Sequence, residues 1–173
     1  MTTAARPTLL GTITLATLLV ACDNPERTVS PTAPHFTMGS GTSSTLIGRA
    51  TFADAFKIKR TTGDWQLEIK AKDPLDVAVQ SIMFQPGGQS GWHSHPGPVF
   101  IQVVSGTMTF YESDDPTCSP IVRTAGQGFL DVGEHAHIAR NESAAPATNV
   151  VTYFAPPGAA LRIDQPAPGT CSF

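Results

Sequence analysis

The chain has 173 residues, enough for one domain once an N-terminal targeting segment is set aside. Charged residues make up only 14%, the net charge is -3 and the basic residues are scattered, which excludes the clustered basic face of a nucleic-acid-binding protein. Glycine and proline number 15 each, and this high content predicts many turns.

The N-terminus has the pattern of an export signal. Arg6 is the only charge before a run of small and apolar residues, Leu9 to Val20, which is too short and too rich in threonine to predict a membrane-spanning helix. The run ends in Leu19-Val20-Ala21-Cys22, which resembles the bacterial lipobox, where the cysteine thiol accepts a lipid and becomes the mature N-terminus. We therefore predict a lipoprotein signal peptide over residues 1–21 and lipidation of Cys22. The alternative is a secretory signal with an incidental cysteine.

Lipidation would anchor the exported protein to a bacterial membrane, on its periplasmic or extracellular face, because several acyl chains hold a protein stably where one chain is marginal. Residues 22–45 are rich in serine, threonine, proline and glycine, and they predict a flexible tether. The folded domain is predicted to cover residues 46–173.

The pattern beyond the tether predicts an all-β domain without a long helix. Residues 51–59 fit either a strand or a short helical turn, and residues 65–70 alternate apolar and polar as a half-buried strand does. Ser105-Gly106 predicts a tight turn that joins its two flanking strands as an antiparallel hairpin. Many short strands between glycine turns indicate a sandwich or small barrel. The further predicted strands cover residues 77–85, 99–104, 107–111, 121–123, 129–132, 137–140 and 149–154.

Two cysteines remain after Cys22, and both lie in the predicted domain. An even pair in an exported chain predicts a disulfide, here between Cys118 and Cys171. It would tie the C-terminal tail to a loop in the middle of the domain. The alternative is two free thiols.

Three histidines at two places carry the strongest functional signal. His93 and His95 are two residues apart, so on a strand their imidazoles share one face and can converge on one point. A third imidazole, from His137 on a later strand, would complete a three-nitrogen face around a metal ion and leave positions open for water or substrate. The alternative is a metal-free barrel in which the histidines only form hydrogen bonds.

Around these histidines the sequence resembles the two motifs of the cupin superfamily, over roughly residues 77–154. The first motif, G-x5-H-x-H-x3-E-x6-G, matches at Gly87, His93, His95 and Gly106, and the second, G-x5-P-x-G-x2-H-x3-N, matches at Gly126, His137 and Asn141. The resemblance implies an antiparallel double-stranded β-helix, the jelly-roll or cupin barrel. The signal and tether before it are predicted from their composition to be disordered. The resemblance is also compatible with a homodimer formed through edge strands.

The match departs from the family pattern at positions that bear on the chemistry. Val99 stands where the first motif has its glutamate, and Val132 and Glu134 stand where the second has proline and glycine. Cupins commonly bind metal with three histidines and that glutamate, so the resemblance implies a three-histidine site here. We expect one divalent transition metal ion (Fe, Mn, Zn, Ni or Cu), between which sequence does not choose.

Four further residues are candidates for the pocket or the surroundings of the metal. Val99 occupies the glutamate position. Glu134 would supply the missing carboxylate, and His135 a fourth ligand, unless the turn directs them to solvent. Trp92, just before the first ligand, either packs at the barrel mouth or stacks on a substrate. The motif positions offer no evident general base, so no catalytic residue is assigned.

These features predict an exported metal-binding protein that takes a small-molecule ligand or substrate. The leading hypothesis is a mononuclear metal-dependent oxygenase, because three facial histidines leave adjacent sites for O2 and a chelating substrate. The alternative is a non-catalytic module that binds or senses a small ligand or a metal.

Overall fold

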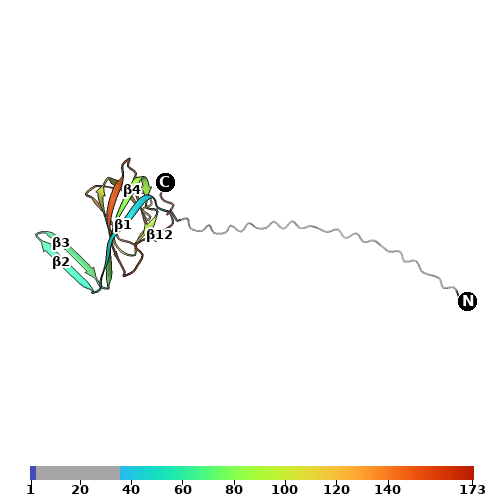
Figure 1. The fold of residues 1–173 in the computed structure, drawn as a ribbon, viewed down its shortest axis with the longest axis horizontal. Coiled ribbons are helices and arrows are strands. Elements are labelled where there is room, and N and C mark those ends of the chain that lie inside the picture. The colour runs from blue at the N-terminus through green and yellow to red at the C-terminus, as the bar shows by residue number, and fades with distance from the viewer. Residues whose placement is uncertain (3–35) are drawn as a thin grey trace. The chain divides into compact units, whose positions relative to one another are not determined.

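The computed structural model describes residues 1–2 and 36–173, and these contain strands and turns but no helix (Figure 1). The predicted signal peptide beyond its first two residues, Cys22 and the tether up to residue 35 lie outside the described residues. In the part described, no helix has the length and apolarity needed to cross a membrane. The strands are β1 Ser40–Phe52, β2 Phe56–Thr62, β3 Trp65–Ala71, β4 Leu75–Gln89, β5 His93–Ser94, β6 Val99–Ser105, β7 Thr107–Glu112, β8 Ile121–Thr124, β9 Gly128–Asp131, β10 His137–Arg140, β11 Ala147–Ala155 and β12 Ile163–Asp164.

Two runs of antiparallel strands make up the barrel. One has the order β1–β4–β11–β6–β9, and the other has the order β12–β5–β10–β7–β8. The runs join where Arg140 of β10 pairs with Gln89 of β4. This nearly closed sheet confirms the predicted all-β, double-stranded β-helix architecture.

The hydrophobic core fills the space between the two runs. Val99, Ile101 and Val103 of β6 are buried while the residues between them are exposed, so the strand has one inward face. Phe110 of β7 stacks on Phe129 of β9 with ring centroids 4.4 Å apart, which joins the two runs across the core. Each such side chain contributes about 1.5–3 kcal/mol through burial.

The folded domain begins earlier than predicted. Strand β1 begins at Ser40, inside the range 22–45 predicted as a tether, and pairs with β4 along its whole length. All of its residues are exposed, so it lacks the apolar face by which a strand is recognised in sequence. Its backbone hydrogen bonds to the edge of β4 order it instead.

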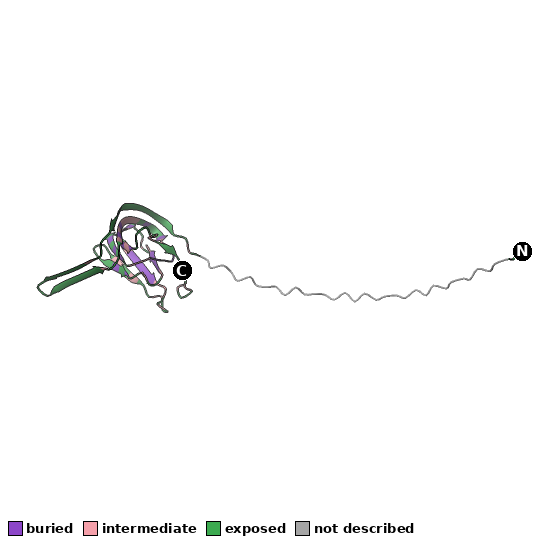
Figure 2. Ribbon diagram, turned by 90° about the horizontal axis from the view of Figure 1, so that it is seen from below, coloured by how far each residue is buried: buried purple, intermediate pink, exposed green. Residues whose placement is uncertain are grey.

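The half-burial predicted for residues 65–70 is wrong, although the strand itself is confirmed. β2 and β3 form a two-stranded sheet of their own, and their residues are almost all exposed (Figure 2). Ile58 of β2 pairs with Ile69 of β3, so these apolar side chains share one face of the hairpin. The alternation of apolar and polar residues therefore predicted the strand correctly, but it did not predict whether a second layer of the protein covers that strand.

The predicted hairpin across Ser105-Gly106 is also wrong. β6 pairs with β11 and β9, whereas β7 pairs with β10 and β8, so this turn carries the chain from one run to the other. A Cβ atom on Gly106 would lie 2.7 Å from the Pro146 carbonyl oxygen, and the residue has a φ of 74°. Glycine is needed here because the turn is tight and because its φ lies in the left-handed region, which residues with a Cβ atom rarely adopt.

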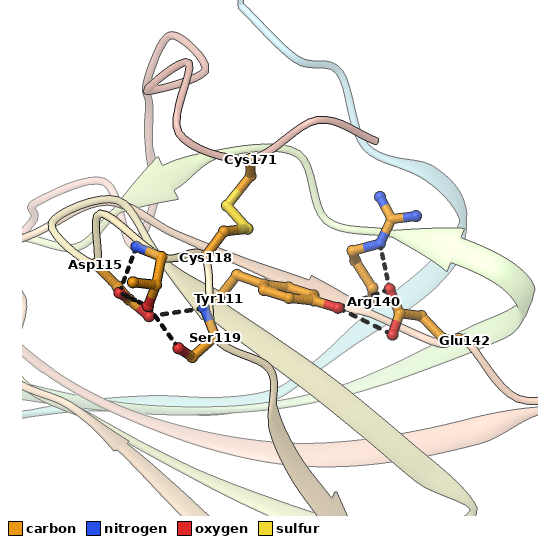
Figure 3. Close-up of a disulfide and its surroundings, with 8 residues drawn as sticks. Tyr111, Asp115, Cys118, Ser119, Arg140, Glu142 and Cys171 are labelled. Atoms are coloured by element: carbon orange, nitrogen blue, oxygen red, sulfur yellow. Dashed lines mark hydrogen bonds and ion pairs between the residues drawn. A yellow bond between two sulfur atoms is a disulfide. The ribbon is translucent and has the colours of Figure 1, made fainter.

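The predicted disulfide between Cys118 and Cys171 is present, with Cα atoms 5.3 Å apart (Figure 3). Both cysteines pack against a small apolar cluster of Trp92, Tyr111 and Ile138. The bond thereby holds the C-terminal tail against β7, β10 and the residue before β5.

Replacing Cys171 with serine should lower the free energy of unfolding by about 2–4 kcal/mol, because the bond closes a loop with a sequence separation of 53 in the unfolded chain. Urea denaturation of the unreduced protein would measure this loss. Cys118→Ser should match it, and Cys22→Ser should leave the midpoint unchanged. An unaltered midpoint in Cys171→Ser would contradict a stabilising bond.

Candidate metal centre

The barrel brings the three predicted histidines together. His93 of β5 pairs directly with His137 of β10, and His95 follows β5 with one residue between it and His93. All three are at least 93% buried, with exposed fractions of 7%, 5% and 3% for His93, His95 and His137. Their ring centroids lie 4.8 Å (His93–His95), 4.5 Å (His93–His137) and 5.2 Å (His95–His137) apart.

One nitrogen of each ring faces a common point. These three atoms lie within 4.8 Å of one another. Two nitrogen ligands of one ion lie at most about 4.2 Å apart, which is twice a metal–nitrogen bond, so a small movement of one ring closes the set around an ion.

Backbone carbonyls hold two of the rings in the tautomer that a metal requires. His93 Nδ1 lies 2.9 Å from the Gly91 oxygen, and His95 Nδ1 lies 2.6 Å from the Leu161 oxygen. A carbonyl oxygen only accepts, so each Nδ1 carries the proton and donates it. The Nε2 lone pair of both rings is then free for a metal.

The third ring faces a buried carboxylate. His137 Nδ1 lies 2.8 Å from Asp131 Oδ2, and the same oxygen lies 3.7 Å from His95 Nε2. Although close, the His137 and Asp131 atoms are not aligned as a hydrogen bond, and both are buried without another partner. The other oxygen, Asp131 Oδ1, accepts a hydrogen bond of 2.7 Å from the Gly133 backbone N–H.

Asp131 is a residue that the sequence reasoning missed. A signal was available, because Asp131 lies two residues after Phe129 on the same strand and therefore shares its inward face. An acid at an inward position of a strand is unusual enough to mark a site.

Burial keeps His93 and His95 uncharged. Desolvation, with a smaller effect of the neighbouring His137, lowers the pKa of His95 to about 4 and that of His93 well below its ordinary value. Burial opposes ionisation of Asp131, but its contacts with His137 and the Gly133 N–H outweigh this and lower its pKa. At neutral pH His93 and His95 therefore present neutral imidazoles, the form that binds metal, next to the Asp131 carboxylate.

A cavity of about 530 Å³ lies beside His93 and His95, within the size range of small-molecule sites. Its wall includes Tyr153, whose hydroxyl donates a hydrogen bond of 2.8 Å to Gln80 Oε1. Burial raises the pKa of Tyr153 to about 12, so its phenol stays protonated at neutral pH. Arg162 is the only arginine or lysine in this wall, and its Nε donates to Asp164 Oδ1.

The other predicted site residues lie elsewhere. Glu134 and His135 are exposed, and His135 Nε2 lies 3.4 Å from an Asp114 carboxylate oxygen, because the turn before β10 directs both side chains outward. Val99 belongs to the hydrophobic core. Trp92 packs in the cluster beside the disulfide and stacks on Phe173 with ring centroids 6.4 Å apart, and its stacking on a substrate stays a prediction.

The comparisons with known proteins agree with this architecture. The family model described as "Cupin domain" matches residues 80–153, the segment that carries both histidine motifs. Residues 80–153 therefore form a cupin superfamily domain, as the motifs predict. No curated protein matches the chain.

Several solved structures resemble the chain in part. A conserved protein with a double-stranded β-helix domain from Klebsiella pneumoniae is 21% identical, with 51% of this chain and 75% of that chain covered and a TM-score of 0.44. The Cupin_2 domain of an XRE family transcriptional regulator from Enterobacter cloacae is 24% identical, with coverages of 47% and 82% and a TM-score of 0.38. A polyketide cyclase from Streptomyces resistomycificus is 14% identical, with coverages of 51% and 59% and a TM-score of 0.44.

The donor set fits a divalent transition metal ion. Neutral imidazoles suit Fe, Zn, Ni and Cu, and the pairing of His93 and His95 with carbonyl oxygens is the support that metal-binding histidines have. His137 Nδ1 and Asp131 Oδ2 are also buried beside these rings without an aligned hydrogen-bond partner. A histidine cluster with only a structural role would not explain why these two atoms are buried without a hydrogen-bond partner.

We expect the untagged full chain to bind one equivalent of Zn²⁺ near neutral pH, and the double variant His93→Ala/His137→Ala to lose this uptake while keeping its β-sheet circular dichroism. Elemental analysis after gel filtration measures the metal. His135→Ala is the matched control, because that ring is exposed and lies outside the group of three. Stoichiometric zinc in the double variant would place the site elsewhere.

Proposed function

We propose that this chain is an exported metal-binding cupin that acts on a small molecule as a mononuclear metal-dependent oxygenase. The observation that carries the proposal is the convergence of His93, His95 and His137, two of which border a cavity of small-molecule size. A bound redox-active ion (Fe, Mn, Ni or Cu) would supply a Lewis acid and one-electron chemistry, whereas Zn would supply only the first.

The chain's own residues would orient this chemistry. The Gly91 and Leu161 carbonyls hold the His93 and His95 rings, so the metal-binding face is formed before a substrate arrives. Ile82 and Phe84 add apolar surface to the cavity wall, which limits water next to the reacting atoms.

The charges around the cavity support a small organic acid as the substrate. After desolvation, the positive charge of Arg162 is a further cause of the lowered pKa of His93 and His95, and it partly offsets the raised pKa of Tyr153. The Nε–H of the Arg162 guanidinium donates a hydrogen bond to Asp164, and the remaining N–H groups are suited to bind the carboxylate of a substrate. The protonated Tyr153 hydroxyl is a further polar group for orienting a substrate.

A binding or sensing module is the second candidate, and one observation favours it. Among the described residues of the cavity wall, Asp164 is the only carboxylate, it pairs with Arg162, and none is a lysine or cysteine. No side chain of the described wall is therefore an evident general base for turnover.

Oxygen consumption by the metal-loaded full chain separates the two functions. With Fe²⁺ and a panel of small organic acids, catechols and thiols, we expect substrate-dependent O2 uptake that falls at least about 100-fold in His93→Ala/His137→Ala, because the ion then has no site. Saturable ligand binding in calorimetry without O2 uptake would instead establish the binding module.

The proposal also places the protein on a bacterial membrane through a lipid on Cys22, which lies outside the described residues. We expect Cys22→Ser to move the protein from the membrane fraction to the released fraction of the expressing bacterium, since the acyl chains are lost. Cys171→Ser, which leaves the signal intact, is the control. Unchanged fractionation of Cys22→Ser would contradict lipidation.

A further inference from the structure

The carboxylate that is absent at the motif position has a counterpart directly across the sheet. Val99 of β6 pairs with Asp131 of β9, and both residues are buried. Residues paired in this way have Cβ atoms about 4.5–5.5 Å apart on the same face of the sheet. A carboxylate at Asp131 therefore enters the barrel next to the place where one at position 99 would.

One of the two carboxylate oxygens of Asp131 forms no hydrogen bond that would explain its burial. Asp131 Oδ1 is held by the Gly133 N–H at 2.7 Å, which fixes the side chain. Asp131 Oδ2 is buried, has no aligned hydrogen-bond partner and lies 2.8 Å from His137 Nδ1. A buried carboxylate with an unsatisfied oxygen destabilises a fold unless something else uses it.

A hydrogen bond from His137 Nδ1–H to Asp131 Oδ2 would give all three histidine rings an acceptor for their Nδ1–H group. His93 and His95 each donate Nδ1–H to a carbonyl oxygen, and His137 has Asp131 Oδ2 as its nearby acceptor. With Nδ1 of His137 protonated as well, the Nε2 lone pair of every ring would be available to a metal ion. Among the described residues, the close ligand group contains the three histidines and not Asp131.

We propose that Asp131 takes over the role of the missing motif glutamate from a neighbouring strand, by accepting the Nδ1–H of His137 and placing one negative charge behind the three-histidine site. Asp131 is thus a positioning residue that acts through His137. The carboxylate raises the basicity of the imidazole and fixes its direction, and the ion keeps the open positions that a fourth protein ligand would occupy. This inference rests on metal binding by the three histidines.

Cobalt binding to the untagged full chain tests the proposal without any activity. Affinity is measured by chelator competition, and the visible spectrum of bound Co²⁺ reports the ligand set. Asp131→Ala should weaken Co²⁺ binding about 10–100-fold, and Asp131→Asn, which keeps an acceptor oxygen but loses the charge, should weaken it less. Glu134→Gln is the charge-matched control, because Glu134 is exposed three residues further along, and should bind as the parent does.

Restoring the motif carboxylate gives a second, independent measurement. Val99→Glu combined with Asp131→Ala should recover at least about 10-fold of the lost affinity, with a Co²⁺ spectrum changed by the new oxygen ligand. If Asp131→Ala fails to fold by circular dichroism, the near-isosteric Asp131→Asn decides alone. The Co²⁺ spectrum of Asp131→Asn should match the parent spectrum, since the ligands are unchanged.

Three outcomes would overturn the inference. Parent-like Co²⁺ affinity in both Asp131→Asn and Asp131→Ala would leave the three-histidine site intact but remove Asp131 from it. A changed ligand-field spectrum in Asp131→Asn would make Asp131 a direct ligand instead of a positioning residue. A parent chain that binds no Co²⁺ would overturn this inference and the proposed function together.

Discussion

The pairing of β5 with β10 is the constraint on which the site depends. In an antiparallel pair, directly opposed residues place their Cβ atoms about 4.5–5.5 Å apart, and His93 and His137 are such a pair. β10 is held in this register by four consecutive pairs with β7, from His137 to Arg140. A slip of one residue would turn His137 to the other face of the sheet and break up the group.

The burial that follows from this pairing decides the chemistry. Desolvation makes the charged, doubly protonated form of His93 and His95 unfavourable. Backbone carbonyl oxygens accept hydrogen bonds from the Nδ1–H groups of the neutral rings. These two rings therefore stay uncharged, so that a metal cation does not have to displace a proton from their Nε2 atoms at neutral pH. Asp131 adds one buried negative charge beside the histidines, which balances part of the charge of a divalent ion.

The sequence correctly predicts where most strands form, because this depends on local chain geometry. It does not predict whether a strand's face is buried, because this depends on which other part of the chain covers it. The strand predicted over residues 99–104 is present as β6, but only the tertiary structure shows that Val99, Ile101 and Val103 face inward while the equally apolar Phe100 and Val104 are exposed. The alternation of apolar and polar residues in β3 predicted a buried face that the described structure does not have. β1 was missed because a strand held at a sheet edge by backbone hydrogen bonds needs no apolar side chains.

The sequence by itself determined an all-β domain and the three histidines, because strand patterns and the two-residue spacing of His93 and His95 are properties of the chain alone, and its resemblance to the cupin motifs implied the double-stranded β-helix. The tertiary structure decided that Gly106 crosses between the two runs instead of closing a hairpin, since strand partners are chosen by the whole barrel. It also decided that the carboxylate beside the histidines belongs to Asp131 and not Glu134. That choice depends on which strand lies next to Val99, and no spacing along the chain records a neighbour across a sheet.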